Sequence, residues 1–161
     1  MSDVVYAIEK LHQFRRDADH LLAEHYQELT SFPEMPLDPN WDLYNQLETE
    51  DRLFIYTARI DGEIVGYAWF MCLKAHPHYK SLSWAGNDII RINPDHRGKG
   101  VAKGLFDFFE ADLKRRGYKV IAVRSKTSFP QLGKMLDERG YKRDSIDHHL
   151  RNFPCQPDSP P

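Results

Sequence analysis

The sequence predicts a mixed α/β domain in which helices flank one mixed sheet. Three observations carry this prediction. Stretches with apolar residues at helical spacing alternate with β-branched and aromatic runs, an Asp-Gly pair joins two of those runs, and a strand–helix–strand unit occupies the second half. The chain has 161 residues, which suits a single domain. We expect that domain over residues 1–153, followed by a disordered proline-rich tail at 154–161.

The N-terminal elements are a strand, a long helix, a loop and a short helix. Residues 4–8 (VVYAI) are β-branched and aromatic, which favours a strand. Apolar residues at steps of three and four predict one long amphipathic helix over 9–29. Three prolines make 31–40 an irregular loop, and 41–48 is predicted as a short second helix.

Three strands are predicted in the middle of the chain. The runs LFIYTARI (53–60) and EIVGYAWFMCL (63–73) flank Asp61-Gly62, and an Asp-Gly pair in that position is a strong hairpin signal. A further strand is predicted over 82–92.

The C-terminal half alternates helices with strands. An amphipathic helix is predicted over 98–116, and Gly117 suits its C-terminal end. A short strand at 120–123, a helix at 130–139 and an extended stretch at 141–152 complete the predicted order.

Composition and charge exclude several classes of protein. The chain carries 22 Lys+Arg against 24 Asp+Glu, a net charge of −2, so nucleic acid is not an expected partner. Two cysteines are too few for a secreted disulfide scaffold. No run is long enough to span a membrane and no signal peptide is visible. We expect a cytoplasmic monomer or homodimer with no membrane partner.

A glycine-rich turn carries the chemistry. A strand ends at Ile92, and Arg97-Gly-Lys-Gly-Val-Ala102 then opens an amphipathic helix. Unpaired N–H groups and the positive end of the helix dipole make such a turn an anion cradle, and glycines let a phosphate approach the backbone. The turn lacks the Gly-Lys-Ser/Thr of a nucleotide-binding P-loop, and Lys103 stands where a dinucleotide fingerprint needs glycine.

The segment Arg97–Ala102 matches the pattern Arg/Gln-x-x-Gly-x-Gly/Ala. With the preceding Ile92-Asn-Pro-Asp-His and the order of elements around it, it resembles the acetyl-CoA-binding motif of the GNAT superfamily of N-acetyltransferases, over residues 4–153. The resemblance implies a mostly antiparallel sheet of six to seven strands, about four flanking helices, and a splayed parallel strand pair that holds CoA. It implies acetyl-CoA as cosubstrate.

The resemblance also implies where acetyl-CoA is bound. The pyrophosphate would lie on the glycine turn, and the strand end would pair with the pantetheine amides through its backbone. The implied cofactor-binding residues are Ile90, Arg91, Ile92, Arg97, Gly98, Lys99, Gly100, Val101 and Ala102. A backbone N–H near Ile89 or Ile90 would stabilise the oxyanion.

The reaction needs a base, because a lysine ammonium with a pKa of ~10.4 is almost fully protonated at pH 7. By position in the superfamily the base candidate is Asp88, because the other common position for the base is occupied by Gly86, which has no side chain to accept a proton. The apolar strand around Asp88 also favours a raised pKa for its carboxyl group. A solvated strand residue is the alternative for Asp88, and Glu63 is the second base candidate. Leu136 stands where the superfamily often has its tyrosine acid, so no general acid is assigned.

The loop between the first two helices is the expected acceptor site. By the resemblance this region lines the acceptor pocket, so Phe32, Met35, Trp41 and Tyr44 are substrate-contact candidates, with ordinary loop packing as the alternative. Nearby acidic residues favour a cationic acceptor, either a small amine-bearing molecule or a protein lysine.

The sequence has three alternative interpretations. The spacing of Cys72, His76 and His78 is compatible with a metal, but no paired Cys-x-x-Cys supports zinc, and no metal is expected. Instead of direct acetyl transfer to a primary amine in a ternary complex, the chain could be a catalytically weak CoA-binding sensor or interaction module. A transferase of another acyl or aminoacyl group to a protein or a nucleic-acid base is the third reading.

Overall fold

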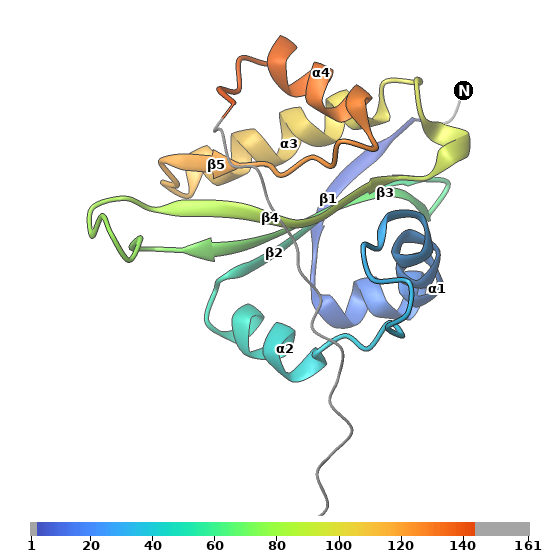
Figure 1. The fold of residues 1–161 in the computed structure, drawn as a ribbon, viewed down its shortest axis with the longest axis horizontal. Helices are drawn as coiled ribbons and strands as arrows, with labels where there is room; N and C mark the ends of the chain where they lie inside the picture. The colour runs from blue at the N-terminus through green and yellow to red at the C-terminus, as the bar shows by residue number, and fades with distance from the viewer. Residues whose placement is uncertain (1–2, 144–161) are drawn as a thin grey trace, which may run out of the picture. The chain divides into compact units, whose positions relative to one another are not determined.

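The computed structural model describes residues 3–143. The chain divides into two compact units, Met1–Arg124 and Ser125–Pro161. Among the described residues, no helix is both long enough and apolar enough to cross a membrane. The first unit contains the whole sheet (Figure 1).

Five strands form one sheet within residues 3–143, in the order β1-β2-β3-β4-β5. The first three pairs are antiparallel and the last is parallel, which confirms the predicted mixed, mostly antiparallel sheet. The expected count of six to seven strands was too high for this part of the chain. Residues 141–143 of the stretch expected at 141–152 are not a strand, and its remainder lies outside the described residues, as does the tail. The strands are β1 (Val5–Glu9), β2 (Leu53–Ile60), β3 (Glu63–Leu73), β4 (Trp84–Ile92) and β5 (Val120–Ala122).

Helices cover both faces of the sheet in the first unit. Helices α1 (Leu11–Leu29) and α2 (Trp41–Thr49) lie on one side, and α3 (Val101–Arg115) lies on the other (Figure 1). Side chains of a strand alternate between faces, so neighbouring residues of β2 and β3 enter two different cores. Trp69 packs against Phe14 of α1 with ring centroids 5.0 Å apart, whereas Phe70 packs against Phe109 of α3 at 4.7 Å.

Local sequence explains where these elements begin and end. The predicted hairpin is confirmed, because Asp61 and Gly62 both have positive φ, at 50° and 88°, as a tight two-residue turn requires. Helix α3 begins at Val101, three residues later than the predicted start at 98. Gly98 and Gly100 have φ of +71° and +83°, which no residue of a right-handed helix adopts. A short 3₁₀ helix, Pro94–His96, precedes them.

The described part of the second unit contains helix α4 (Pro130–Glu138). Its proline at the first helical position and Gly140 just beyond its end, at φ +80°, are the start and stop signals that predicted it. Leu136 lies in this helix.

Gly104 is where α3 approaches β1, and its substitution provides a test of that packing. A Cβ at Gly104 would overlap the Tyr6 phenol, whose Cε2 would lie only 2.8 Å away. Overpacking of this kind costs about 1–3 kcal/mol, against the roughly 1 kcal/mol that a helical glycine gains on becoming alanine. We expect Gly104→Ala to lower the free energy of unfolding by up to about 2 kcal/mol in urea denaturation.

The matched control is Gly133→Ala in α4, because its Cβ would meet only Ser125 Oγ at 3.9 Å. This variant should keep or raise the free energy of unfolding, and Tyr6→Ala should relieve most of the loss in Gly104→Ala. Equal losses at positions 104 and 133 would contradict the proposed close approach.

Candidate active site

The glycine turn has the geometry of an anion cradle. Gly100 is the N-cap of α3, and no side chain caps the helix, so the first-turn N–H groups have no intrahelical partner. Apart from the adjoining residues of the turn, no atom of residues 3–143 lies within 4 Å of where a Cβ would be at Gly98 or Gly100. The backbone here is open to a ligand, and the Lys99 side chain between the two glycines is exposed. The residues present therefore fit a pyrophosphate.

Ion pairs fix this turn to α1. Arg97 donates from Nε to the Ile92 carbonyl at 2.9 Å and pairs with Glu28. Arg91, whose side chain is almost fully buried, also reaches Glu28 at 3.4 Å and Glu24 at 3.2 Å. Burial opposes ionisation of Glu28, but Arg97 and Arg91 outweigh it and hold the pKa of that carboxyl below its usual value. The charges of Arg97 and Arg91 are thus balanced by α1, and Lys99 is the cation on the open side of the turn.

Strands β4 and β5 pair over only three positions, from Trp84↔Val120 to Gly86↔Ala122. Beyond them the buried Asn87 side chain accepts from the Arg124 backbone N–H at 2.6 Å, and the Arg124 guanidinium donates to the Asn87 carbonyl at 3.3 Å. Within the described chain, residues 88–92 of β4 have no strand on this edge. The predicted opening therefore lies beside Ile90, Arg91 and Ile92, and their backbone edge faces it.

A β-bulge in β4 determines which way the Asp88 side chain faces. Trp69 pairs with Ile89 and Phe70 with Asn87, so Asp88 is an extra residue in β4 with no partner in β3. The bulge lets two consecutive residues face α1 and α2. Ile89 packs against their core, and Asp88 accepts a hydrogen bond from the Tyr44 hydroxyl of α2 at 2.7 Å.

The surroundings of Asp88 make it a stronger base than an ordinary aspartate. Burial raises the pKa of Asp88, and the opposing effects of the Tyr44 hydrogen bond and the Arg124 charge are smaller. Burial and the neighbouring Asp88 carboxylate also raise the pKa of Tyr44, so its phenol stays a proton donor. The carboxylate is held in one orientation beside the open edge of β4, where it can accept a proton.

One of the four expected acceptor residues contacts Asp88, and a second packs beside that residue. Tyr44 contacts Asp88 directly, and Trp41 lies beside Tyr44 with ring centroids 6.0 Å apart. The Arg15 guanidinium carbon lies 3.8 Å from the centre of the Trp41 ring, so a cation already uses this aromatic face.

The other two acceptor candidates belong to the preceding loop. The Phe32 and Met35 carbonyls both accept from the Tyr26 hydroxyl, at 2.9 and 2.5 Å. That contact fixes the loop to α1. The Met35 side chain itself is 58% exposed, so it is available to a ligand.

The structure does not bring the second base candidate to Asp88. Glu63 is the exposed first residue of β3, six positions before Trp69, which is about 20 Å along a strand. His76 and His78 lie together on the β3–β4 loop, with ring centroids 5.6 Å apart. Within residues 3–143 no group of three or more His, Cys, Asp or Glu side chains is arranged to hold a metal ion.

Sequence reasoning missed three residues of this site. Asn87 and Arg124 fix the point where β4 and β5 separate, and Glu28 fixes the glycine turn. Asn87 could have been noticed in the sequence, because a side-chain amide inside an apolar strand needs a hydrogen-bond partner. Glu28 and Arg124 carried none, because their partners are 69 and 37 residues away in sequence.

The edge of β4 that is unpaired among the described residues lies beside a glycine turn that fits a phosphate. A fold with these two features can hold a long cosubstrate that has a phosphate group at one end and a reactive group at the other. The sequence matches the Acetyltransferase (GNAT) family over residues 16–133. The chain belongs to this family and is an acetyltransferase. Acetyl-CoA is the acetyl donor of the family, and the family match confirms the resemblance seen in the sequence.

Solved structures show the same fold across nearly the whole chain. A ribosomal-protein-alanine N-acetyltransferase from Brucella melitensis is 25% identical, with a TM-score of 0.68 over 94% of this chain and 99% of that one. An aminoglycoside acetyltransferase from an uncultured soil metagenomic sample, in complex with sisomicin, is 11% identical with a TM-score of 0.73, over 93% and 96%. A predicted acetyltransferase with acetyl-CoA, from Clostridium acetobutylicum, is 15% identical with a TM-score of 0.68, over 92% and 96%. No curated protein matches the sequence significantly.

Proposed function

We propose that the chain transfers the acetyl group of acetyl-CoA to a primary amine by direct attack in a ternary complex. The observation that carries this proposal is Asp88, a carboxylate with a raised pKa on the bulge of β4, beside the strand edge that the cosubstrate would use. Direct attack requires a base close to both reactants, and no covalent nucleophile is needed.

Residues of the first unit would hold both ends of the donor. The N–H groups of the glycine turn, from Gly98 to Ala102, would bind the pyrophosphate, with Lys99 adding a positive charge. The open edge of Ile90–Ile92 would pair with the pantetheine amides. When bound, acetyl-CoA supplies a thioester at the end of that edge, near the bulge.

Asp88 would act on the amine. It would take one proton from the ammonium, directly or through a water. The raised pKa of Asp88 makes the difference between the pKa values of the carboxyl and the ammonium smaller, which favours this transfer. The new N–C bond then replaces the C–S bond, and a backbone N–H near Ile89 or Ile90 would stabilise the oxyanion. The attacking nitrogen then loses its second proton to solvent, and the CoA thiolate leaves with the electron pair of the C–S bond and takes up a proton from solvent. The sequence has Leu136 at the position expected for a tyrosine acid.

We further propose that the acceptor is cationic. Glu34 and Asp38 lie on the loop that leads to α2, and Asp42 lies on the first turn of that helix, next to Trp41 in sequence. Their negative potential favours an ammonium over an anionic amine. Two of the structural neighbours, an aminoglycoside acetyltransferase and a ribosomal-protein-alanine N-acetyltransferase, are named for amine acceptors.

The test is an acceptor screen that follows release of free thiol from acetyl-CoA. A polyamine, an aminoglycoside, a lysine peptide and a peptide with a free N-terminal alanine are the cationic arms, and aspartate and glutamate are the anionic arms. We expect turnover with at least one cationic arm and little with the anionic ones. Binding of acetyl-CoA without turnover on any arm would favour the sensor interpretation, and an anionic amine as best acceptor would overturn the cationic preference.

Trp41→Ala tests whether the Trp41 ring, one face of which Arg15 already covers, contributes to acceptor binding. Loss of one aromatic contact removes about 1 kcal/mol, so we expect the acceptor KM to rise about fivefold with little change in kcat. The affinity for acetyl-CoA should stay within about twofold. Leu43→Ala is the matched control, because Leu43 is on the same helix and is 42% exposed. A variant Trp41→Ala that changes only the acetyl-CoA affinity would show that Trp41 has no part in acceptor binding.

A further inference from the structure

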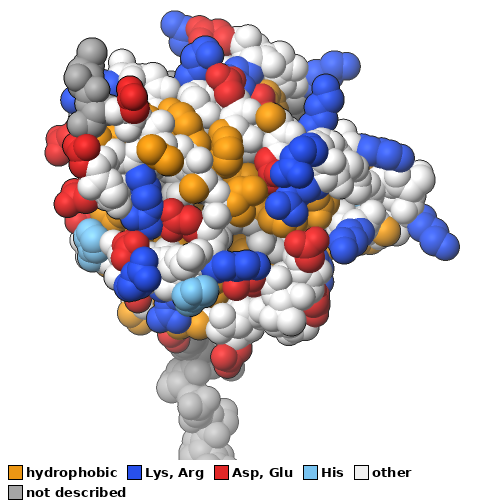
Figure 2. All heavy atoms as spheres, turned by 180° about the vertical axis from the view of Figure 1, so that it is seen from behind, with side chains coloured by type: hydrophobic (Ala, Val, Ile, Leu, Met, Phe, Trp, Pro, Cys, Tyr) orange, Lys and Arg blue, Asp and Glu red, His pale blue; other side chains and the backbone are white. Residues whose placement is uncertain are grey.

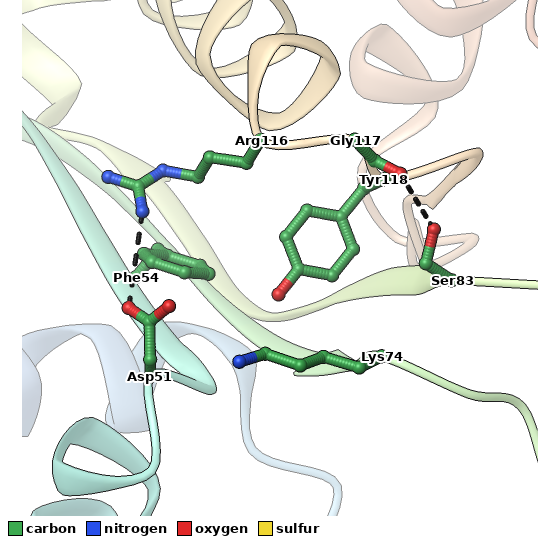
Figure 3. Close-up of a pocket in the computed structure, with 7 residues that line it drawn as sticks. All are labelled: Asp51, Phe54, Lys74, Ser83, Arg116, Gly117 and Tyr118. Atoms are coloured by element: carbon green, nitrogen blue, oxygen red, sulfur yellow. Dashed lines mark hydrogen bonds and ion pairs between the residues drawn. The ribbon is translucent and has the colours of Figure 1, made fainter.

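A pocket of about 430 Å³ lies at the end of the sheet where β4 begins and α3 ends (Figure 3). The glycine turn is at the opposite end, where β4 ends and α3 begins. The 15 residues of α3 separate the two places by about 22 Å along the helix axis. The pocket is therefore not part of the proposed transferase site.

The floor of the pocket is aromatic. Phe54 and Tyr118 pack edge to face, with ring centroids 6.1 Å apart and planes at 69°. The Arg116 guanidinium carbon lies 4.3 Å from the centre of the Phe54 ring. Tyr118 is only half-buried, and its hydroxyl points into the pocket (Figure 3). A planar group can stack on such a surface, as aromatic side chains do on one another.

Charged groups of both signs face the same space. Figure 3 shows the Lys74 ammonium on the same side of the pocket as the Tyr118 hydroxyl, and the Asp51 carboxylate directed toward Arg116. Arg116 is held by Asp112, with Nε 2.6 Å from Oδ2, and lies 4.0 Å from Asp51. Within residues 3–143, Lys74 makes no ion pair. Arg116 is thus held in place by Asp112, and the Lys74 ammonium is available to bind an anion.

The mouth of the pocket is basic. The chain from Ile64 to Asn87 has no acidic residue but contains Lys74 and Lys80, and Figure 2 shows Lys and Arg side chains where the β3–β4 hairpin projects. Lys119 joins this hairpin, donating from Nζ to the Ser81 carbonyl at 2.8 Å and from its backbone N–H to Ser83. A one-sided positive field attracts anions to the opening.

We propose that this pocket binds a nucleoside phosphate. The base would stack on Tyr118, the phosphate would lie between Lys74 and Arg116, and Asp51 would accept hydrogen bonds from ribose hydroxyls or a ring N–H. The volume lies within the range of small-molecule sites, about 300–1,000 Å³. A simple anion would use the cations but not the aromatic floor or Asp51.

The test is calorimetric titration of the whole protein with AMP, GMP, CMP and UMP, once without CoA and once with enough CoA to fill the proposed cofactor site, because CoA itself carries an adenosine phosphate that can compete for the pocket. Inorganic phosphate and the free nucleosides are the comparison probes. We expect at least one monophosphate to bind at least tenfold more tightly than phosphate and than its own nucleoside. Lys74→Ala should weaken that binding at least fivefold, whereas Lys80→Ala, which removes an exposed lysine of the same hairpin, should change it less than twofold.

Four outcomes would overturn the proposal. These are no binding of any monophosphate with or without CoA, inorganic phosphate binding as tightly as the nucleotides, a free nucleoside binding as tightly as its monophosphate, and equal losses of affinity in Lys74→Ala and Lys80→Ala. The last would show diffuse surface charge in place of a defined site. Tyr118→Leu adds an independent measurement, since it removes the stacking surface and leaves the charges; unchanged nucleotide affinity in that variant would also overturn the proposal.

Discussion

Asp88→Asn is expected to lower kcat by roughly 10²-fold or more, with the affinity for acetyl-CoA changed less than twofold. The amide keeps the shape of the side chain and can still accept from the Tyr44 hydroxyl, but it cannot take a proton. The proposed cosubstrate contacts are backbone groups elsewhere on β4 and the glycine turn, so binding should survive. Thiol release with the best acceptor, and calorimetry with acetyl-CoA, measure the two quantities.

A stability measurement separates this effect from unfolding. Folding raises the pKa of Asp88 above its unfolded value of ~3.9, so the stability that protonated Asp88 contributes is present at low pH and is lost as pH rises through the folded pKa. At neutral pH the buried carboxylate therefore costs stability, and Asp88→Asn should melt no lower than the parent. A large fall in melting temperature would assign Asp88 a structural role.

The pH profile supplies a second, independent readout. In the parent, kcat should rise with pH as Asp88 ionises. Tyr44→Phe removes a hydrogen bond that lowers the pKa of Asp88, so the midpoint of this rise should move to higher pH while the plateau remains. Equal rates in the parent and Asp88→Asn at every pH would rule out the base role.

The fold was predictable because its signals are local. The strands at 53–60 and 63–73 have the predicted bounds, since an Asp-Gly turn between two runs rich in β-branched and aromatic residues fixes a hairpin without help from the rest of the chain. The start of α3 was wrong by three residues, because apolar periodicity cannot distinguish a helix from the left-handed turn that precedes it. The number of strands was overestimated within the described residues because it came from the family's typical sheet.

The site was predictable only in part. Asp88 and the glycine turn stood out, because a carboxylate in an apolar strand and glycines before a helix are unusual for their surroundings. The bulge at Asp88 leaves no mark in the sequence, since it depends on the register between β3 and β4. That bulge is what turns Asp88 toward Tyr44, so the contact between a predicted base and a predicted acceptor residue could be found only in the structure.

Gly100→Val is expected to weaken binding of CoA at least tenfold, or ~1.4 kcal/mol. The Cβ and its branches would project from the N-cap of α3 into space that no described atom occupies within 4 Å of that Cβ, which is where the pyrophosphate would lie. A branched residue at φ +83° is also strained, by about 1–3 kcal/mol, so a loss of stability alone must be excluded.

Gly62→Val provides the matched control for Gly100→Val. Gly62 has φ +88° and equally open surroundings, but it is the turn residue of the β2–β3 hairpin and lies outside the segment 97–102. Both variants should lose similar stability in thermal unfolding, and only Gly100→Val should lose affinity for CoA in calorimetric titration. Unchanged CoA affinity in a folded Gly100→Val protein, or equal losses of affinity in both variants, would remove the glycine turn from the cosubstrate site, since steric exclusion at the N-cap would then have no effect of its own.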